Sequence, residues 1–145
     1  TDAATGRPAF LSAARPADLA AAVAASCAIP GVLPAVRIDG HLFIDGGLRS
    51  PANLDVAGSA RAVVALAPLT GSVRAHRRPA DQAAQLRRAG VTVALLTPDS
   101  DGRRAIGLDP LAAGRVPAAF DAGRRLGGRH AVRIGQVWSA DDSLS

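Results

Sequence analysis

The chain has 145 residues, of which 48% are hydrophobic, and this length and composition suffice for one ordinary domain with a core. Its net charge is +5, but aromatic residues make up only 3%, so it lacks the stacking surfaces that single-stranded nucleic acids require. The charge therefore does not predict nucleic-acid binding, while weak contact with an anionic membrane surface stays open.

Residue usage gives further limits. The single cysteine, Cys27, excludes an internal disulfide bond, and its small, apolar neighbours predict a buried, unreactive thiol. No window reaches the roughly 18–20 apolar residues of a membrane-spanning helix. The chain opens on Thr1 and contains no methionine, so we expect the true amino terminus to lie upstream. A signal peptide is then not assessable, and the location stays cytoplasmic or unassigned. The arginine- and alanine-rich composition is typical of a GC-rich bacterial genome.

The first predicted elements are an extended piece and a helix. Residues 7–12 are expected to be extended, and Pro16 to open a helix that runs to about Cys27, because proline is tolerated in a first turn. Nearly all residues of this helix are small or apolar, which predicts burial on all sides. Pro30 ends it, since proline disfavours helix in the residue before it.

A β-hairpin is predicted next. Residues 36–38 and 42–44 are apolar-rich runs on either side of Asp39-Gly40-His41, and Asp-Gly is a strong turn signal. The second strand then carries Asp45 to its end. A brief helix is expected from Pro51 to Val56.

A strand–helix–strand unit follows the hairpin. Residues 62–67 and 91–96 are continuous apolar runs, as expected for strands covered on both faces. Between them, a helix is predicted from Pro79 to Ala89, with Gly90 as its cap. This order indicates an α/β fold with an at least partly parallel sheet.

The carboxy-terminal third is predicted to be mainly helical. Thr97-Pro98-Asp99 is interpreted as a turn. Residues 114–127 are expected to form a helix, with Val116, Ala119, Phe120 and Gly123 on one face. After Gly127-Gly128, residues 131–138 fit either helical spacing or alternation, and residues 141–145 form a polar tail.

Asp45-Gly46-Gly47 is the main candidate site. An aspartate on a glycine-supported loop after a strand can orient and deprotonate a serine hydroxyl, which would normally lie in a Gly-x-Ser-x-Gly turn. That pattern does not occur in the 145 residues. The alternative interpretation is an ordinary strand-end turn, where Asp and Gly are common.

The remaining candidate residues are interpreted as structural. Ser26 lies at a helix end expected to be buried and lacks the flanking glycines of a nucleophile. Ser50 and Asn53 are expected to make caps or loop hydrogen bonds. The three histidines show no local metal-ligand spacing and are expected at the surface: His41, His76 and His130.

Residues 25–36, followed by residues 45–53, resemble patatin-like phospholipases. The opening Thr1-Asp2 and Thr5-Gly6 also look like that family's strand end and following turn. The resemblance spans essentially the whole chain and is most specific over residues 25–53. It implies a three-layer α/β sandwich with a mostly parallel central sheet, of which residues 1–145 form the carboxy-terminal part of one domain.

The resemblance also implies a lipid acyl hydrolase of the phospholipase A or esterase type. That family cleaves acyl esters with a Ser-Asp dyad, so Asp45 would be the dyad aspartate and Gly46 and Gly47 its loop. No metal or organic cofactor is implied. The serine would lie in the missing amino-terminal part of the same domain, so this chain alone is expected to be inactive. The alternative is a non-catalytic interaction module that has lost the nucleophile.

Overall fold

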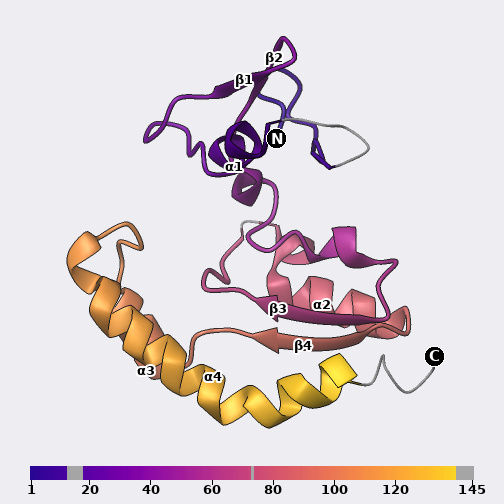
Figure 1. Cartoon of the computed structure of the whole chain (residues 1–145), viewed down its shortest axis with the longest axis vertical. Helices are drawn as coiled ribbons and strands as arrows, with labels where there is room; N and C mark the ends of the chain where they lie inside the picture. The colour runs from indigo at the N-terminus through magenta and orange to yellow at the C-terminus, as the bar shows by residue number, and fades with distance from the viewer. Residues whose placement is uncertain (13–17, 73, 140–145) are drawn as a thin grey trace.

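The computed structural model describes residues 1–12, 18–72 and 74–139. The chain forms an amino-terminal part, residues 1–48, and a carboxy-terminal part, residues 54–139, which lie one above the other along the long axis (Figure 1). Each part has its own hydrophobic cluster. The described residues are thus of mixed α/β type, with two small sheets and two small cores.

The amino-terminal part is a hairpin packed on one helix. Strands β1 (Val36–Ile38) and β2 (His41–Phe43) pair antiparallel, which confirms the predicted hairpin. Asp39 and Gly40 both have positive φ, of 49° and 82°, as the favoured two-residue hairpin turn requires. Ile38 and Phe43 pack with Ala25 of helix α1 (Leu19–Ser26) to form the small core.

Helix α1 is much more exposed than its sequence predicts. Leu19 and Val23 are 77% and 55% exposed, and Ala25 is the buried residue of this helix, so the expected burial on all sides is wrong. Cys27, just beyond the helix, is likewise exposed rather than buried. One face of α1 meets the hairpin, and the opposite face has no cover among the described residues. The predicted start at Pro16 lies outside those residues.

The carboxy-terminal part confirms the strand–helix–strand unit. Strands β3 (Ala62–Leu66) and β4 (Thr92–Leu96) pair in parallel, and helix α2 (Pro79–Arg88) connects them. The amphipathic face of α2 buries Ala83 and Leu86 against the sheet. The prediction that these strands are covered on both faces is wrong for the end of β3, because Leu66 is 71% exposed.

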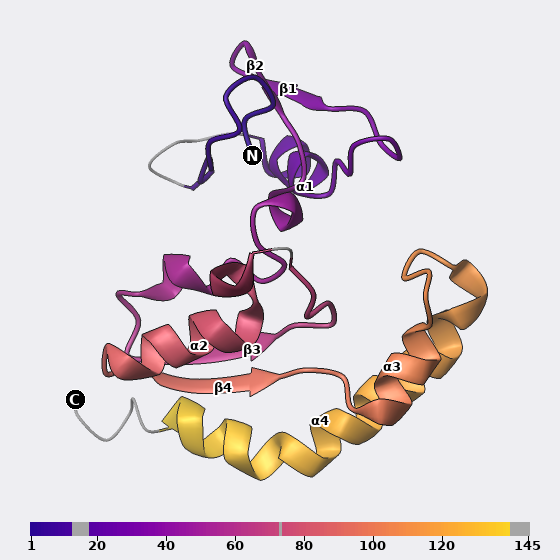
Figure 2. The same ribbon diagram turned by 180° about the vertical axis from the view of Figure 1, so that it is seen from behind.

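Two helices complete the chain. Helix α3 (Ser100–Ile106) was not predicted; Asp99, interpreted as part of a turn, caps it by accepting a 2.8 Å hydrogen bond from the Gly102 amide. Helix α4 (Val116–Ser139) is one continuous helix across Gly127-Gly128 and runs along α3 and β4 (Figures 1 and 2).

The buried face of α4 differs from the predicted one. Ala122 and Val137 are buried, whereas Phe120 is 68% exposed. The brief helix expected from Pro51 is a 3-10 helix, η2 (Leu54–Ala57). The described strands form two separate two-stranded sheets, so the α/β class is found but a three-layer sandwich is not confirmed. The predicted polar tail, residues 141–145, lies outside the described residues.

Candidate functional site

Asp45 is held at the end of β2 from two sides. The Ile44 amide donates to the Thr1 carbonyl at 2.8 Å, and the Asp45 amide donates to the Ala28 carbonyl at 3.0 Å. These bonds tie the strand end to the opening segment and to the turn after α1. The two segments on which the resemblance rests, residues 25–36 and 45–53, therefore meet in space at Asp45.

The Asp45 carboxylate caps the 3-10 helix η1 (Gly46–Leu48). Its Oδ1 accepts a short hydrogen bond from the Gly47 amide. A Cβ on Gly47 would lie 2.9 Å from this same oxygen, a contact too close for a side chain. Gly46 has more room, since a Cβ there would meet Asn53 Nδ2 at 3.7 Å. Close approach to the carboxylate, rather than a left-handed backbone, thus explains glycine at position 47.

The side chain of Asp45 has capacity beyond this cap. The residue is half-buried, and no described residue donates to its Oδ2. A carboxylate with one oxygen fixed by the backbone and one available for a further donor can cap a turn and accept a proton. The capping geometry by itself is also what an ordinary strand-end turn would show.

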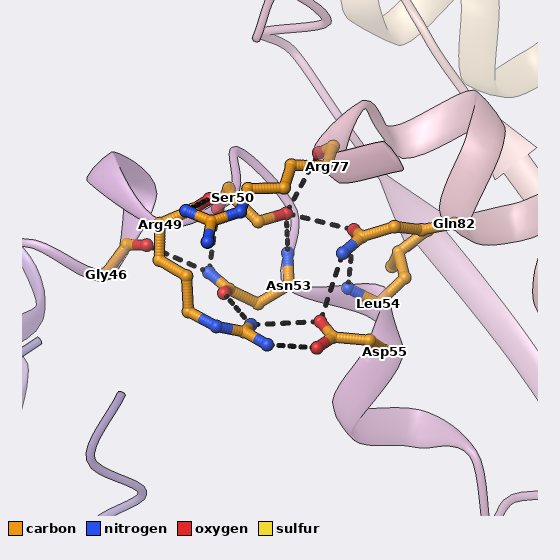
Figure 3. Close-up of polar contacts among 8 residues, drawn as sticks. All are labelled: Gly46, Arg49, Ser50, Asn53, Leu54, Asp55, Arg77 and Gln82. Carbon is orange, nitrogen blue, oxygen red and sulfur yellow. Dashed lines mark hydrogen bonds and ion pairs between the residues drawn. The ribbon is translucent and has the colours of Figure 1, made fainter. Parts of the chain in front are cut away.

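Asn53 connects this turn to the rest of its loop (Figure 3). Its Nδ2 donates to the carbonyls of Gly46 and Ser50, at 3.2 and 2.8 Å, and its Oδ1 accepts from Arg49 Nη1 at 2.7 Å. The backbone of Asn53 is left-handed, with φ 46° and ψ 39°. The loop hydrogen bonds expected of Ser50 and Asn53 are thus confirmed.

Ser50 carries the connection into α2. Its side chain is buried, with its Oγ 2.9 Å from Gln82 Oε1 and 3.1 Å from the Arg77 carbonyl, and it can donate to either. The same Oγ accepts from the Asn53 amide at 3.0 Å. Gln82 Oε1 also accepts a hydrogen bond from the Leu54 backbone amide at 3.1 Å. Every polar atom of this buried cluster has a partner, as buried polar groups require.

An ion pair closes the network. Arg49 reaches both carboxylate oxygens of Asp55, and Gln82 Nε2 donates to Asp55 Oδ1 at 3.1 Å. The hydrogen bonds from Arg49 hold the pKa of Asp55 below its ordinary value, and the same contact raises the pKa of Arg49. Sequence reasoning missed Arg49, Asp55 and Gln82 as a set, because Gln82 lies 27 positions from Asp55 and no local pattern connects them.

The other candidates take minor places. Ser26 is exposed rather than buried, and it lines a cavity of about 210 Å³ that also touches Gly46 and Phe43. His41 and His76 are exposed, as predicted, whereas His130 is half-buried within α4. Within the described ranges, no group of His, Cys, Asp or Glu is arranged to hold a metal ion. None of the helices in those ranges is long and apolar enough to cross a membrane.

A second apolar cavity lies away from Asp45. It has a volume of about 590 Å³ and opens between the ends of β3 and β4 and the two last helices. Its walls include Leu66, Ile106 and Leu126, and none of its lining residues belongs to the Asp45 loop. Cavity size alone therefore does not identify the candidate site, which rests on Asp45 and its neighbours.

Comparison with known proteins supports the resemblance over one stretch of the chain. No curated protein matches the chain. Residues 2–57 match the family model described as Patatin-like phospholipase. The match includes Asp45, Gly46, Gly47 and Asn53 and ends before β3, so the strand–helix–strand unit lies outside it. Over residues 2–57, the chain is thus similar to the patatin-like phospholipases.

Proposed function

We propose that this chain is part of a lipid acyl hydrolase of the phospholipase A or esterase type, with Asp45 as the aspartate of a Ser-Asp dyad. The observation that carries the proposal is the meeting of residues 25–36 with Asp45 inside the matched stretch. The serine would come from a segment outside residues 1–145. Together the two would complete one three-layer patatin-like domain, of which this chain is the carboxy-terminal part.

In the proposed reaction, Asp45 moves one proton twice. It accepts the proton of the serine hydroxyl as the serine oxygen attacks the acyl carbonyl, then returns it to the departing alcohol. Water repeats the sequence on the acyl-enzyme and releases the fatty acid. The Gly47 amide fixes Oδ1, which leaves Oδ2 for the hydroxyl. The dyad needs no metal or organic cofactor.

A non-catalytic interaction module is the second candidate function. One observation favours it: the cap formed by Asp45 explains its position without catalysis. The two proposals differ in whether a serine in the full-length protein is activated. A serine probe on that protein separates them.

The test is Asp45→Asn in the full-length protein that contains this chain, with Asp39→Asn as the matched control on the exposed hairpin turn. Asparagine is as good a helix cap as aspartate, so the melting temperature should stay unchanged. Loss of the proton acceptor should lower kcat on p-nitrophenyl butyrate by about 100- to 10,000-fold.

Intact-mass spectrometry with a fluorophosphonate probe completes the experiment. One adduct on a serine outside residues 1–145 of the wild-type protein, with kcat lost only in Asp45→Asn, would support the dyad. An unlabelled protein without turnover would favour the interaction module. Full turnover by Asp45→Asn would rule out the role given to this aspartate.

A further inference from the structure

We propose that Asn53 is a positioning residue for Asp45: its side-chain amide fixes the loop that carries this carboxylate and braces that loop on helix α2. The inference rests on the proposed function, because it concerns the same aspartate. It adds a residue that does not touch the reacting atoms and acts through the backbone.

The two hydrogen bonds from Asn53 Nδ2 form a clamp on the loop, and the first of them reaches Gly46, the residue after Asp45. The Gly46 carbonyl accepts from Asn53 Nδ2 at 3.2 Å and from the backbone amide of Arg49 at 3.0 Å. The second proton of Nδ2 goes to the Ser50 carbonyl at 2.8 Å. One amide group thus ties both ends of the turn that Asp45 caps, and Figure 3 shows Asn53 at the centre of these contacts.

The clamp is itself held from α2. Asn53 has a left-handed backbone, a conformation that asparagine tolerates better than most residues but that still needs support. The backbone amide of Asn53 donates to Ser50 Oγ, and the same Oγ contacts Gln82 of α2. Ser50 is only 1% exposed. A side chain on a rigid helix, held by buried hydrogen bonds, is the kind of support that keeps a reactive group in place.

This arrangement predicts a particular kinetic signature. Asn53 contacts the loop through the Gly46 and Ser50 carbonyls and is not among the residues that line the cavity beside Gly46, so we expect its loss to change the position of Asp45 rather than KM. Displacement of a catalytic group by about 1 Å can cost about 100-fold in rate. Loss of the clamp should therefore appear in kcat.

The experiment compares Asn53→Gly with Asp39→Gly in the full-length protein. Both replaced residues have left-handed backbones, with φ of 46° and 49°, so glycine relieves similar strain at each. For hydrolysis of p-nitrophenyl butyrate, we expect kcat of Asn53→Gly to fall by about 100-fold with KM within a factor of two, and Asp39→Gly to match wild type. Hydrogen exchange of residues 46–50 should become faster in Asn53→Gly alone.

Asn53→Asp is the second variant. It keeps the acceptor for Arg49 but loses both donors, so we expect it to fail like Asn53→Gly, even if the glycine variant is too unstable to assay. If either folded variant keeps wild-type kcat while Asp45→Asn has none, the positioning role is wrong and the dyad stands. If Asp45→Asn itself keeps turnover, the proposed function fails as well. Equal losses in kcat and the melting temperature for Asn53→Gly and Asp39→Gly would also overturn the positioning role.

Discussion

Arg49 and Asp55 form the charged end of the network that supports the candidate site. Arg49 follows η1 directly, and Asp55 lies in η2, so the pair joins the Asp45 loop to the carboxy-terminal part. Both side chains are only partly exposed, 22% and 35%, which places the pair between a surface salt bridge and a buried one. We therefore expect the Arg49–Asp55 pair to stabilise the fold to an extent that depends on pH.

Asp55→Asn should lower the melting temperature at neutral pH, and the difference from wild type should vanish in acid. The pKa of Asp55 is lowered in the folded state, mainly by hydrogen bonds from Arg49. A lowered folded-state pKa means that the stabilisation is fully present above the ordinary aspartate value of 3.8 and is lost as the pH falls below it. Thermal unfolding of both proteins from neutral pH to well below 3.8 measures this convergence.

The exposed Asp121→Asn on α4 is the matched control for that titration, and its difference from wild type should not follow the same course. If the melting temperature of Asp55→Asn stays below that of wild type at low pH, the destabilisation comes from packing or from the hydrogen bond with Gln82 rather than from the charge of Asp55.

At this scale, sequence predicted the position of Asp45 but not its support. Asp45, Gly46 and Gly47 are neighbours in sequence, so strand end, turn and motif could be recognised together. Ser50 and Gln82 are separated by 32 positions, and only folding of α2 against the loop brings them into contact. The exposure of Cys27 was missed for a related reason: its apolar neighbours in sequence do not surround it in space.

At the scale of elements, local signals succeeded where they agreed. The hairpin and helix α2 combine turn residues, caps and periodicity, and both were predicted. The sequence predicts helix α4 only over residues 114–127, and residues 131–138 fit either helix or alternation. The helix is continuous across Gly127-Gly128 and packs on α3 and on the strands β3 and β4. Helix α3 was missed because its cap, Asp99, also fits a turn.

Gly128→Ala should therefore stabilise the protein. Gly128 is inside α4, and a Cβ there would meet nothing within 4 Å. Alanine removes backbone freedom from the unfolded chain and should raise the free energy of unfolding by about 0.5–1 kcal/mol. Chemical denaturation measures the change.

Gly107→Ala is the matched counterpart and should destabilise. Gly107 ends α3 with a φ of 75°, and a Cβ there would lie 2.8 Å from the Arg115 side chain. If both Gly128→Ala and Gly107→Ala stabilise the protein, the lower entropy of the unfolded chain outweighs the close contact and the positive φ at Gly107. Destabilisation by Gly128→Ala would indicate that α4 does bend at its glycine pair.

At the scale of the whole molecule, two small cores are connected by one polar network. Large apolar side chains are exposed on several elements, among them Leu19 and Val23 on α1, Leu66 on β3, and Phe120 and Trp138 on α4. Large exposed apolar surface is typical of interaction sites or of a liability to aggregate. Under the proposed function, the segment with the nucleophile would cover part of it.

The 145-residue chain alone should consequently self-associate, whereas the full-length protein should not. Light scattering after size exclusion, with an apolar dye as a second readout, measures the difference. Leu19→Gln with Val23→Gln is the informative double variant, because both residues lie on the uncovered face of α1 and contribute little to the hairpin core. If that face is where the missing segment packs, the double variant should reduce association and dye binding of the short chain while it destabilises the full-length protein. A short chain that is monomeric and binds no dye would instead be a self-sufficient unit, and the interaction module would become the better account of its function.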